Sequence, residues 1–221
     1  MSTRHYTDID RFLINIDTGL RTLFGSRHNT GRPNPADLLD QDEAPTKDSE
    51  MPAHDRDLAG RLMRINHAGE VAAQGLYQGQ ALTAALPAVR QQMERAAAEE
   101  NDHLDWCRRR TEEMGTHTSR LDPLWYLGSV FIGALAGKAG DKWSLGFVAE
   151  TEKQVVKHLD EHLNRIDESD IKTRAILEQM KEDEGHHATT AIASGGQELP
   201  LPIKTTMGLV SKIMTKTSYW I

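Results

Sequence analysis

The stretch EENDHLDWC, residues 99–107, decides the fold class, because it sets a glutamate and a histidine three residues apart in helix-forming sequence. Inward residues of a helix that packs along one face recur at alternating steps of three and four. Here that series is apolar except for its glutamate and its histidine, and consists of Val89, Met93, Ala96, Glu100, His103 and Cys107. We therefore expect Glu100 and His103 to face the core. The neighbouring acids Glu99 and Asp102 are expected to face water.

A second stretch, EDEGHHATT at residues 182–190, has the same Glu-x-x-His spacing and offers two alternative pairs. One series is apolar apart from its glutamate and histidine, and consists of Leu177, Met180, Glu184, His187 and Ala191. The competing series, which contains Asp183 and His186, is polar. The pattern therefore predicts that Glu184 and His187 point inward.

Two further helical segments each bring a single glutamate to their apolar face. In one, the face consists of Leu145, Val148, Glu152, Val155, Leu159 and Ile166. The neighbouring Glu150 falls on a series that is expected to face solvent. In the other, the face consists of Ala59, Met63, Asn66, Glu70, Ala73 and Tyr77. Glu152 and Glu70 are therefore the inward acids.

Four inward glutamates and two inward histidines predict a metal centre. An isolated ionised carboxylate is costly to bury, and several together also repel one another. A shared multivalent cation removes both problems, and four carboxylates balance the charge of two divalent ions. The order Glu, Glu-x-x-His, Glu, Glu-x-x-His is the ligand set already established for ferritin-like di-iron and di-manganese bundles. The spacing alone leaves the metal, the substrate and the reaction open.

The composition favours one all-α domain with a sizeable core. The chain has 221 residues, is rich in helix formers and contains no convincing alternating strand. Its net charge of −7 argues against nucleic-acid binding. The single cysteine, Cys107, excludes an internal disulfide and a CxxC metal site, which suits a reducing compartment. The N-terminus MSTRHYTDID lacks the basic start and apolar run of a signal peptide, so we expect no export.

Periodicity and capping residues predict the elements and the domain limits. An amphipathic helix is expected over 7–24, and the proline-rich residues 25–54 lose all periodicity, as a linker, a surface excursion or a loose tail. Residues 1–54 are therefore expected to be separate from a main domain over 55–221. The helices of that domain are predicted at 55–85, 88–114, 123–138, 141–167, 170–194 and 202–221.

Two segments outside the acid-bearing helices are expected to contact a membrane. Residues 123–137, PLWYLGSVFIGALAG, are uncharged but shorter than the ~20 residues of a spanning helix. They favour an interfacial element with Trp125 and Tyr126 at the headgroups, or alternatively a buried helix. Residues 199–221 combine lysines, no acid, an apolar stripe and Trp220. This is typical of an amphipathic helix on a membrane surface, and is also compatible with packing on the bundle or on a partner.

Five other side chains are candidates for the surroundings of the site. His158 and His162, four residues apart, are compatible with a metal site or with a solvated face. His67 lies either beside the site or on an outer helix face. Tyr77 is expected near the metals or in ordinary core, and Cys107 in the core rather than as a ligand.

Four segments carry a resemblance to a known family: RINHAGEVAAQGLYQGQ (64–80), EENDHL (99–104), VAETEKQVVKH (148–158) and DEGHH (183–187). Over residues 55–221 the chain is similar to the demethoxyubiquinone hydroxylases, in their longer bacterial form. The resemblance implies a ferritin-like four-helix bundle with a di-metal centre, whose ligands are Glu70, Glu100, His103, Glu152, Glu184 and His187.

The resemblance also bears on the neighbours of these ligands. His158 matches a family histidine close to the metals, which implies a role in supporting the site or in handling protons. The family usually reads Glu-Leu-Glu-His where this chain has EGHH. A shift of one residue would select Asp183 and His186, and the polarity of that face argues against it.

The implied activity is hydroxylation of a ring carbon of a polyprenyl demethoxybenzoquinol in ubiquinone biosynthesis. Two iron ions would be the cofactor, with manganese also compatible with the ligands, O2 the co-substrate, and NADH or an NADH-fed reductase the electron source. The implied location is peripheral, on the cytoplasmic face of the cell membrane. Other ubiquinone-biosynthesis proteins and further copies of the chain are candidate partners, and nucleic acid is not.

Three other classes share part of this pattern. A ferritin-like iron store or ferroxidase uses the same ligands but gives no reason for the apolar run 123–137. A rubrerythrin-like peroxidase usually carries a CxxC module, which the single cysteine excludes. A metal-free structural bundle or quinone-binding accessory protein would lose no stability on chelation.

Overall fold

The computed structural model describes residues 7–24, 30–39, 48 and 50–221. Within these ranges the chain is helical and forms no β-strand, as the sequence predicts. The elements are α1 (Asp8–Phe24), the short 3₁₀ helix η1 (Pro35–Asp37), α2 (Ala53–Thr83), α3 (Pro87–Glu113), α4 (Asp122–Lys138), α5 (Asp141–Leu163), α6 (Ile171–Ala193) and α7 (Leu201–Ser218).

The helix limits agree with the expected ones to within two residues, with two exceptions: α5 stops at Leu163 rather than at residue 167, and α7 stops at Ser218 rather than at residue 221. Arg174 of α6 donates from Nη1 to the carbonyl oxygens of Leu163, at 2.9 Å, and of Ile166, at 3.4 Å. These carbonyls are therefore satisfied without a further helical turn. Ile166 is buried although it lies outside the helix, and its apolar side chain extends the helical pattern past the true end.

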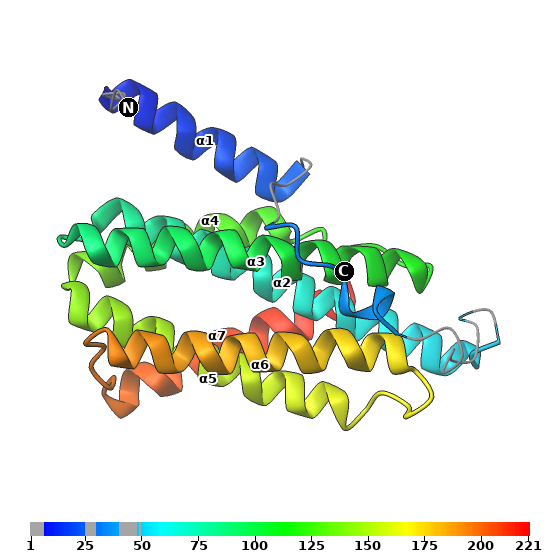
Figure 1. Ribbon diagram of the computed structural model, residues 1–221. Coiled ribbons are helices and arrows are strands. Elements are labelled where there is room, and N and C mark those ends of the chain that lie inside the picture. The colour runs from blue at the N-terminus through cyan, green and yellow to red at the C-terminus, as the bar shows by residue number, and fades with distance from the viewer. Residues whose placement is uncertain (1–6, 25–29, 40–47, 49) are drawn as a thin grey trace.

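The helix α2 is the centre of the bundle. It packs mainly against α3 and α4 and more weakly against α5 and α7, while α5 packs against α6. Figure 1 shows α2, α3 and α4 as one layer, with α5 and α6 forming a second. The acid-bearing segments thus lie on four helices that face one another.

Two apolar clusters fill the core of the bundle. The first includes Leu62, Met63, Trp106, Leu159 and Met180. The second includes Tyr77, Met93, Leu145, Val148 and Ala191. In each of α2, α3, α5 and α6 the acid-bearing turn lies between the residues that join the first cluster and those that join the second. The acids are therefore held at a common depth, enclosed by apolar side chains on both sides.

Glycines bring α2 and α4 into backbone contact. Each helix carries a Gly-x-x-x-Gly spacing, Gly75 and Gly79 in α2 and Gly133 and Gly137 in α4. A Cβ atom at Gly79 would collide with the carbonyl oxygen of Val130, and one at Gly133 would meet backbone atoms of α2. Small residues at this spacing let two helices approach closely. The apolar segment 123–137 is therefore fixed directly to the central helix.

The expected amphipathic helix over 7–24 is present as α1, which lies outside the bundle (Figure 1). It touches the bundle at few points, among them a bond of 2.8 Å from Gln78 Nε2 to the backbone oxygen of Asn15. Much of its apolar side stays exposed, including Ile9, Leu13 and Leu20.

The described part of the proline-rich segment runs along α3 and α6. Asp37 accepts two hydrogen bonds of 2.6 Å from the guanidinium of Arg109, and Asp48 accepts two of 3.0 Å from the buried Arg110. For these residues the contacts favour a surface excursion over a loose tail. Residues 25–29, 40–47 and 49 lie outside the described part of the chain. The expected separation of residues 1–54 from a main domain over 55–221 stays a prediction.

In the ranges that the structure describes, no helix is both long enough and apolar enough to cross a lipid bilayer.

Candidate metal centre

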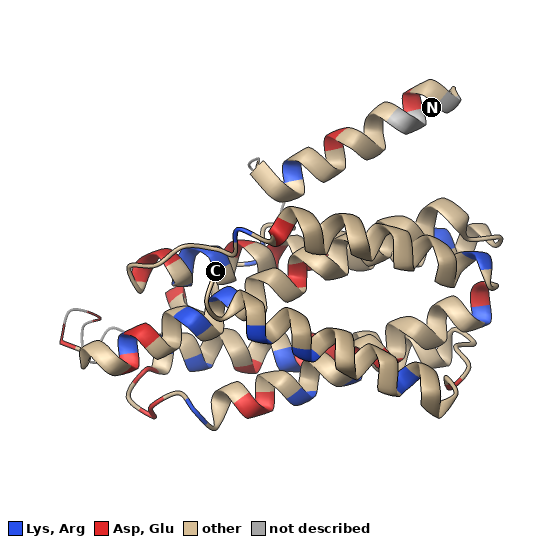
Figure 2. Cartoon of the chain, turned by 180° about the vertical axis from the view of Figure 1, so that it is seen from behind, with Lys and Arg blue, Asp and Glu red and all other residues tan. Residues whose placement is uncertain are grey.

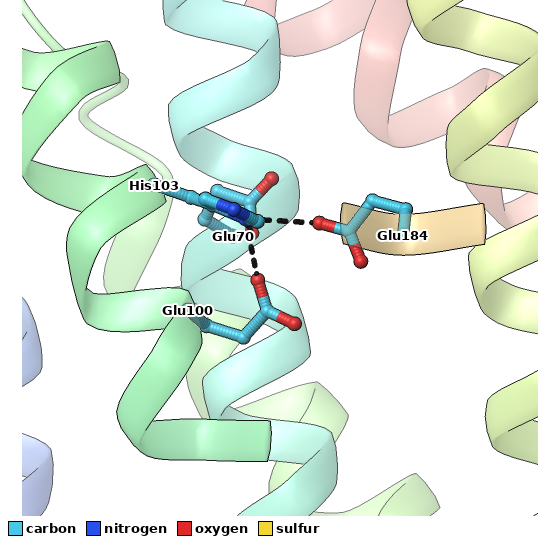
Figure 3. A group of neighbouring side chains, drawn as sticks. All are labelled: Glu70, Glu100, His103 and Glu184. Atoms are coloured by element: carbon cyan, nitrogen blue, oxygen red, sulfur yellow. Dashed lines mark hydrogen bonds and ion pairs between the residues drawn. The ribbon is translucent and has the colours of Figure 1, made fainter. Parts of the chain in front are cut away.

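Acidic side chains from three helices converge with a histidine in the core. Their ligand atoms all lie within 4.8 Å of one another and belong to Glu70 of α2, Glu100 and His103 of α3, and Glu184 of α6. Figure 3 shows these side chains gathered between the helices, with Glu184 pointing toward His103. Each of them is at most 3% exposed. The predicted inward orientation of all four residues is therefore confirmed.

Two of the carboxylates, Glu100 and Glu184, contact both histidines of the site. His103 Nδ1 lies 2.9 Å from Glu100 Oε2 and 2.9 Å from Glu184 Oε1. His187 Nδ1 lies 3.1 Å from the other oxygen of each carboxylate. Both carboxylates therefore reach from one histidine to the other.

The remaining two glutamates complete the group. Glu70 Oε2 lies 3.9 Å from His103 Nδ1. Glu152, which is 1% exposed, accepts a hydrogen bond of 2.5 Å from the hydroxyl of Tyr77. The same hydroxyl lies 3.5 Å from Glu100. Tyr77 thus belongs to the second apolar cluster and also contacts the acids through its hydroxyl.

Burial and mutual repulsion disturb the titration of these groups. Burial raises the pKa of Glu70 well above its ordinary value, and the charges of Glu100 and Glu184 raise it further. The pKa of Glu152 is raised by burial and by the same two neighbours. Burial by itself lowers the pKa of His187, but its hydrogen bonds to Glu100 and Glu184 outweigh that effect and raise it to about 12. Without a cation, the cluster is neutralised by protons.

This donor set fits two metal ions. Metals bind carboxylates and imidazoles in their deprotonated forms, so two divalent ions would replace the protons and keep the site near neutral. Glu100 and Glu184 each reach both His103 and His187. These four residues would hold the ions together with Glu70 and Glu152. The ligand role of all six residues stays a prediction.

Each histidine is also held from outside by an acid of the opposite helix. His103 Nε2 lies 2.8 Å from Asp183 Oδ2, and His187 Nε2 lies 2.8 Å from Glu99 Oε2. An acceptor of this kind fixes the proton on the outer nitrogen and leaves the inner nitrogen free for a metal. Glu99 was expected to face water, and its side chain is 49% exposed, yet its carboxylate serves the site.

A cavity of about 500 Å³ adjoins the acids. Glu70, Glu152 and Glu184 contribute to its wall, and most of the remaining wall is apolar. Part of that wall comes from α4 and α7, through residues that include Ile132, Ile203, Met207 and Val210. A mostly apolar cavity of this size with a small number of polar groups is typical of a site for a small organic molecule.

The part of the chain that builds this site and its cavity matches the sequence model of a known family. The family model of the ubiquinone biosynthesis protein COQ7 covers residues 57–218. The chain belongs to the COQ7 family. The family suggested by the four sequence segments is therefore confirmed.

Relatives of this COQ7 family chain named 3-demethoxyubiquinol 3-hydroxylase match it over nearly their whole length. The protein from Nitrosococcus oceani is 58% identical over 221 residues, 100% of both chains. That from Stutzerimonas stutzeri is 56% identical over 220 residues, 100% of this chain and 99% of the relative. That from Acinetobacter baumannii is 52% identical over 218 residues, 99% of this chain and 100% of the relative. The match to these COQ7 relatives therefore also includes the N-terminal segment before residue 57.

His158, the seventh predicted site residue, lies on the cavity of this COQ7 bundle. Its Nε2 atom is 3.0 Å from Ser211 Oγ of α7, and its Nδ1 atom is 3.6 Å from Glu161. It lines the same cavity as Glu70, Glu152 and Glu184. Its expected role in supporting the site or handling protons stays a prediction.

The choice between the two acid–histidine pairs of α6 agrees with the burial. Glu184 and His187 are 1% and 8% exposed, whereas His186 lies on the outer face. Asp183 is partly buried and contacts the outer nitrogen of His103.

Two expectations about solvent-facing acids are wrong. Asp102 is 1% exposed, because the backbone nitrogen and the hydroxyl of Thr30 donate to it and Arg32 lies against it. The side chain of Glu150 is 14% exposed, because α7 covers that face with Lys204 at 3.6 Å. In both cases a segment distant in sequence covers a polar helix face.

The other three candidates are core residues. His162 is buried and its Nδ1 atom lies 2.9 Å from Asn66 Oδ1, so it is not on a solvated face. His67 is 1% exposed, with its Nδ1 atom 3.1 Å from Asp122 Oδ2. Cys107 is buried in the first apolar cluster, as expected.

Sequence reasoning missed Arg32, which reaches the site from the proline-rich segment. No periodicity marks a residue in irregular sequence. The signal in the sequence is indirect: an acid at Asp102, one residue from the inward-facing series, requires a cationic or hydrogen-bonding partner if it is buried.

Proposed function

We propose that this chain is a 3-demethoxyubiquinol 3-hydroxylase, a monooxygenase that hydroxylates the ring of a polyprenyl demethoxybenzoquinol in ubiquinone biosynthesis. The observation that supports it most strongly is the acid cluster in the wall of a mostly apolar cavity. The name shared by full-length relatives at 52–58% identity points to the same activity.

The proposed cofactor is a pair of iron ions held by Glu70, Glu100, His103, Glu152, Glu184 and His187. Bound iron would supply the redox chemistry that activates O2, with electrons from NADH or from a reductase. Manganese fits the same ligands, and iron is preferred because the proposed reaction consumes O2. The chain's own contribution is to hold the ligands in place and to exclude bulk water with the two apolar clusters.

The cavity is proposed to bind the quinol ring and the start of its prenyl chain. The ring would lie near the three glutamates of the wall, and the prenyl chain along the apolar side chains of α4 and α7. Tyr77 would keep the carboxylate of Glu152 in a fixed orientation through its hydroxyl.

We further propose that the enzyme docks on the cytoplasmic face of the cell membrane through α4 and α7. Both helices expose large apolar side chains, which include Leu127 and Phe131 of α4 and Leu209 and Ile213 of α7. Figure 2 shows the long uncharged stretch of α4, whose charged residues lie only at its ends. A substrate dissolved in the bilayer could then enter between these helices. Other ubiquinone-biosynthesis proteins and further copies of the chain remain candidate partners.

Quinone profiling by mass spectrometry tests the proposed activity. A strain lacking this gene is complemented with the wild type, with Glu184→Ala, or with Glu182→Ala, whose side chain lies on the exposed face of the same helix. We expect demethoxyubiquinone to accumulate in the deletion strain and with Glu184→Ala, and to be cleared by the wild type and by Glu182→Ala.

Normal ubiquinone in the deletion strain, with no second hydroxylase in that strain, would contradict the proposal. Iron oxidation by the purified protein without quinol hydroxylation would favour a ferritin-like ferroxidase instead.

A further inference from the structure

Arg32, in the segment between α1 and η1, reaches the outer side of the proposed metal centre. Its Nη1 atom donates to Asp183 Oδ2 at 2.9 Å, and its Nε atom donates to Asp102 Oδ2 at 3.1 Å. Its Nη2 atom lies 3.3 Å from His103 Nε2. The guanidinium carbon lies 5.0 Å from the centre of the Trp106 ring, within the range of a cation–π contact.

These contacts converge on the acid that holds His103. The oxygen of Asp183 that accepts from Arg32 is the same oxygen that lies 2.8 Å from His103 Nε2. Its other oxygen accepts from Gln179 Nε2 at 3.0 Å. The second acid, Asp102, is fixed by both Arg32 and Thr30. The planar guanidinium therefore sets the position of Asp183 relative to the histidine.

The other histidine is held differently. His187 Nε2 is bonded to Glu99, whose side chain is 49% exposed, whereas the side chain of Asp183 is 16% exposed. The Glu99 side chain also has one more rotatable bond than an aspartate side chain, since it is one methylene longer. The two halves of the site thus differ in how firmly the outer acid is held.

We propose that Arg32 is a positioning residue for the half of the centre that contains His103. This inference rests on the proposed metal centre. Arg32 acts through Asp183: it keeps that carboxylate on the outer nitrogen of His103, so that the inner nitrogen stays directed at the metal. Outer partners of metal-bound histidines typically contribute about 10–100-fold to metal affinity.

The test measures iron release. Wild type, Arg32→Ala, Arg32→Lys and Asp37→Ala are loaded with Fe²⁺ without oxygen, and transfer of iron to a coloured chelator is followed with time. Asp37→Ala is the matched control, because it removes a contact of the same segment, with Arg109, away from the histidine. Asp183→Asn is a second variant that leaves the N-terminal segment unchanged.

We expect the wild type to bind two irons and release both slowly. In Arg32→Ala and Asp183→Asn one of the two should leave about 10–100-fold faster while the other keeps its rate. Arg32→Lys should fall between, since an ammonium cannot reproduce the planar fork. Asp37→Ala should behave as wild type.

Unchanged release in Arg32→Ala, or equal acceleration of both irons in Arg32→Ala and Asp37→Ala, would overturn this inference while the metal centre stands. A correctly folded wild type that binds no iron would overturn the metal centre and this inference with it.

Discussion

Neighbouring residues of α6 have opposite environments, and the site depends on that difference. Glu184 and His187 are buried against α3, while His186 lies outside. One residue turns a helical side chain by about 100°, so a single helix can present only one of its two acid–histidine pairs to the other acids.

Replacing His186 and His187 one at a time by alanine distinguishes the two possible acid–histidine pairs of α6. We expect His187→Ala to lose one of the two metal ions, because its Nδ1 atom faces Glu100 and Glu184. His186→Ala should keep the metal content of the wild type. Iron per chain, measured after removal of loosely bound metal, gives the result. Loss of metal from His186→Ala with retention in His187→Ala would mean that the sequence register is shifted by one.

The sequence predicts the inward acids correctly and the outward acids only in part. Glu100 and Glu184 are recognisable because the members of their series other than the glutamate and the histidine are apolar. Asp102 belongs to a polar series and still is buried, because Thr30 and Arg32 cover it from a segment without periodicity. Helical patterns register a helix's own composition, and they carry no information about a polar partner that arrives from elsewhere in the chain.

At the scale of the elements, α4 depends on glycine for its contact with α2. Gly133 lies where the backbone of α2 leaves no room for a side chain, whereas Gly128, one and a half turns earlier, faces open space. Both glycines carry the ordinary entropic disadvantage of glycine in a helix. Only at Gly133 does the close approach require it.

Alanine substitutions at the two glycines should therefore have opposite effects on the free energy of unfolding. We expect Gly133→Ala to destabilise the protein by about 1–3 kcal/mol through overpacking. Gly128→Ala should stabilise it by about 0.5–1 kcal/mol, because alanine loses less backbone entropy. Urea unfolding followed by circular dichroism measures both. A neutral Gly133→Ala would show that α4 can move away from α2 at little cost.

The position of each helix along the chain follows from local sequence, but which helix covers which face of another helix does not. The seven α-helices of the described residues are all marked by periodicity, prolines or capping residues, as at Asp170, whose side chain accepts from the backbone nitrogen of Thr173. The burial of Glu150 depends on where α7 packs after the Gly195–Gly196 turn. That placement comes from tertiary contacts, such as the one from Trp125 of α4 to Ser218 of α7 at 3.1 Å.

At the scale of the whole molecule, the two helices α4 and α7, which bound the cavity, both expose apolar side chains. Ile132 of α4 and Val210 of α7 line the cavity and are 37% and 46% exposed. Lys212 and Lys216 of the same helix α7 are exposed, and residues 199–221 contain no acid. An apolar surface beside lysines suits the interface of an anionic bilayer.

Vesicle binding tests this proposed docking surface directly. Leu127 and Phe131 are 65% and 66% exposed on α4, so their joint replacement by serine should weaken binding to phosphatidylethanolamine–phosphatidylglycerol vesicles by tenfold or more, at about 25 cal/mol per Å² of apolar surface. The matched control replaces Leu38 and Ile192, exposed apolar residues outside α4 and α7, by serine and should bind as the wild type does. Added salt should weaken wild-type binding, because the lysines act through screened charge. Iron content should be unchanged in both variants, since none of the four side chains is a proposed ligand. Equal loss of binding in both would show that α4 is not the docking surface.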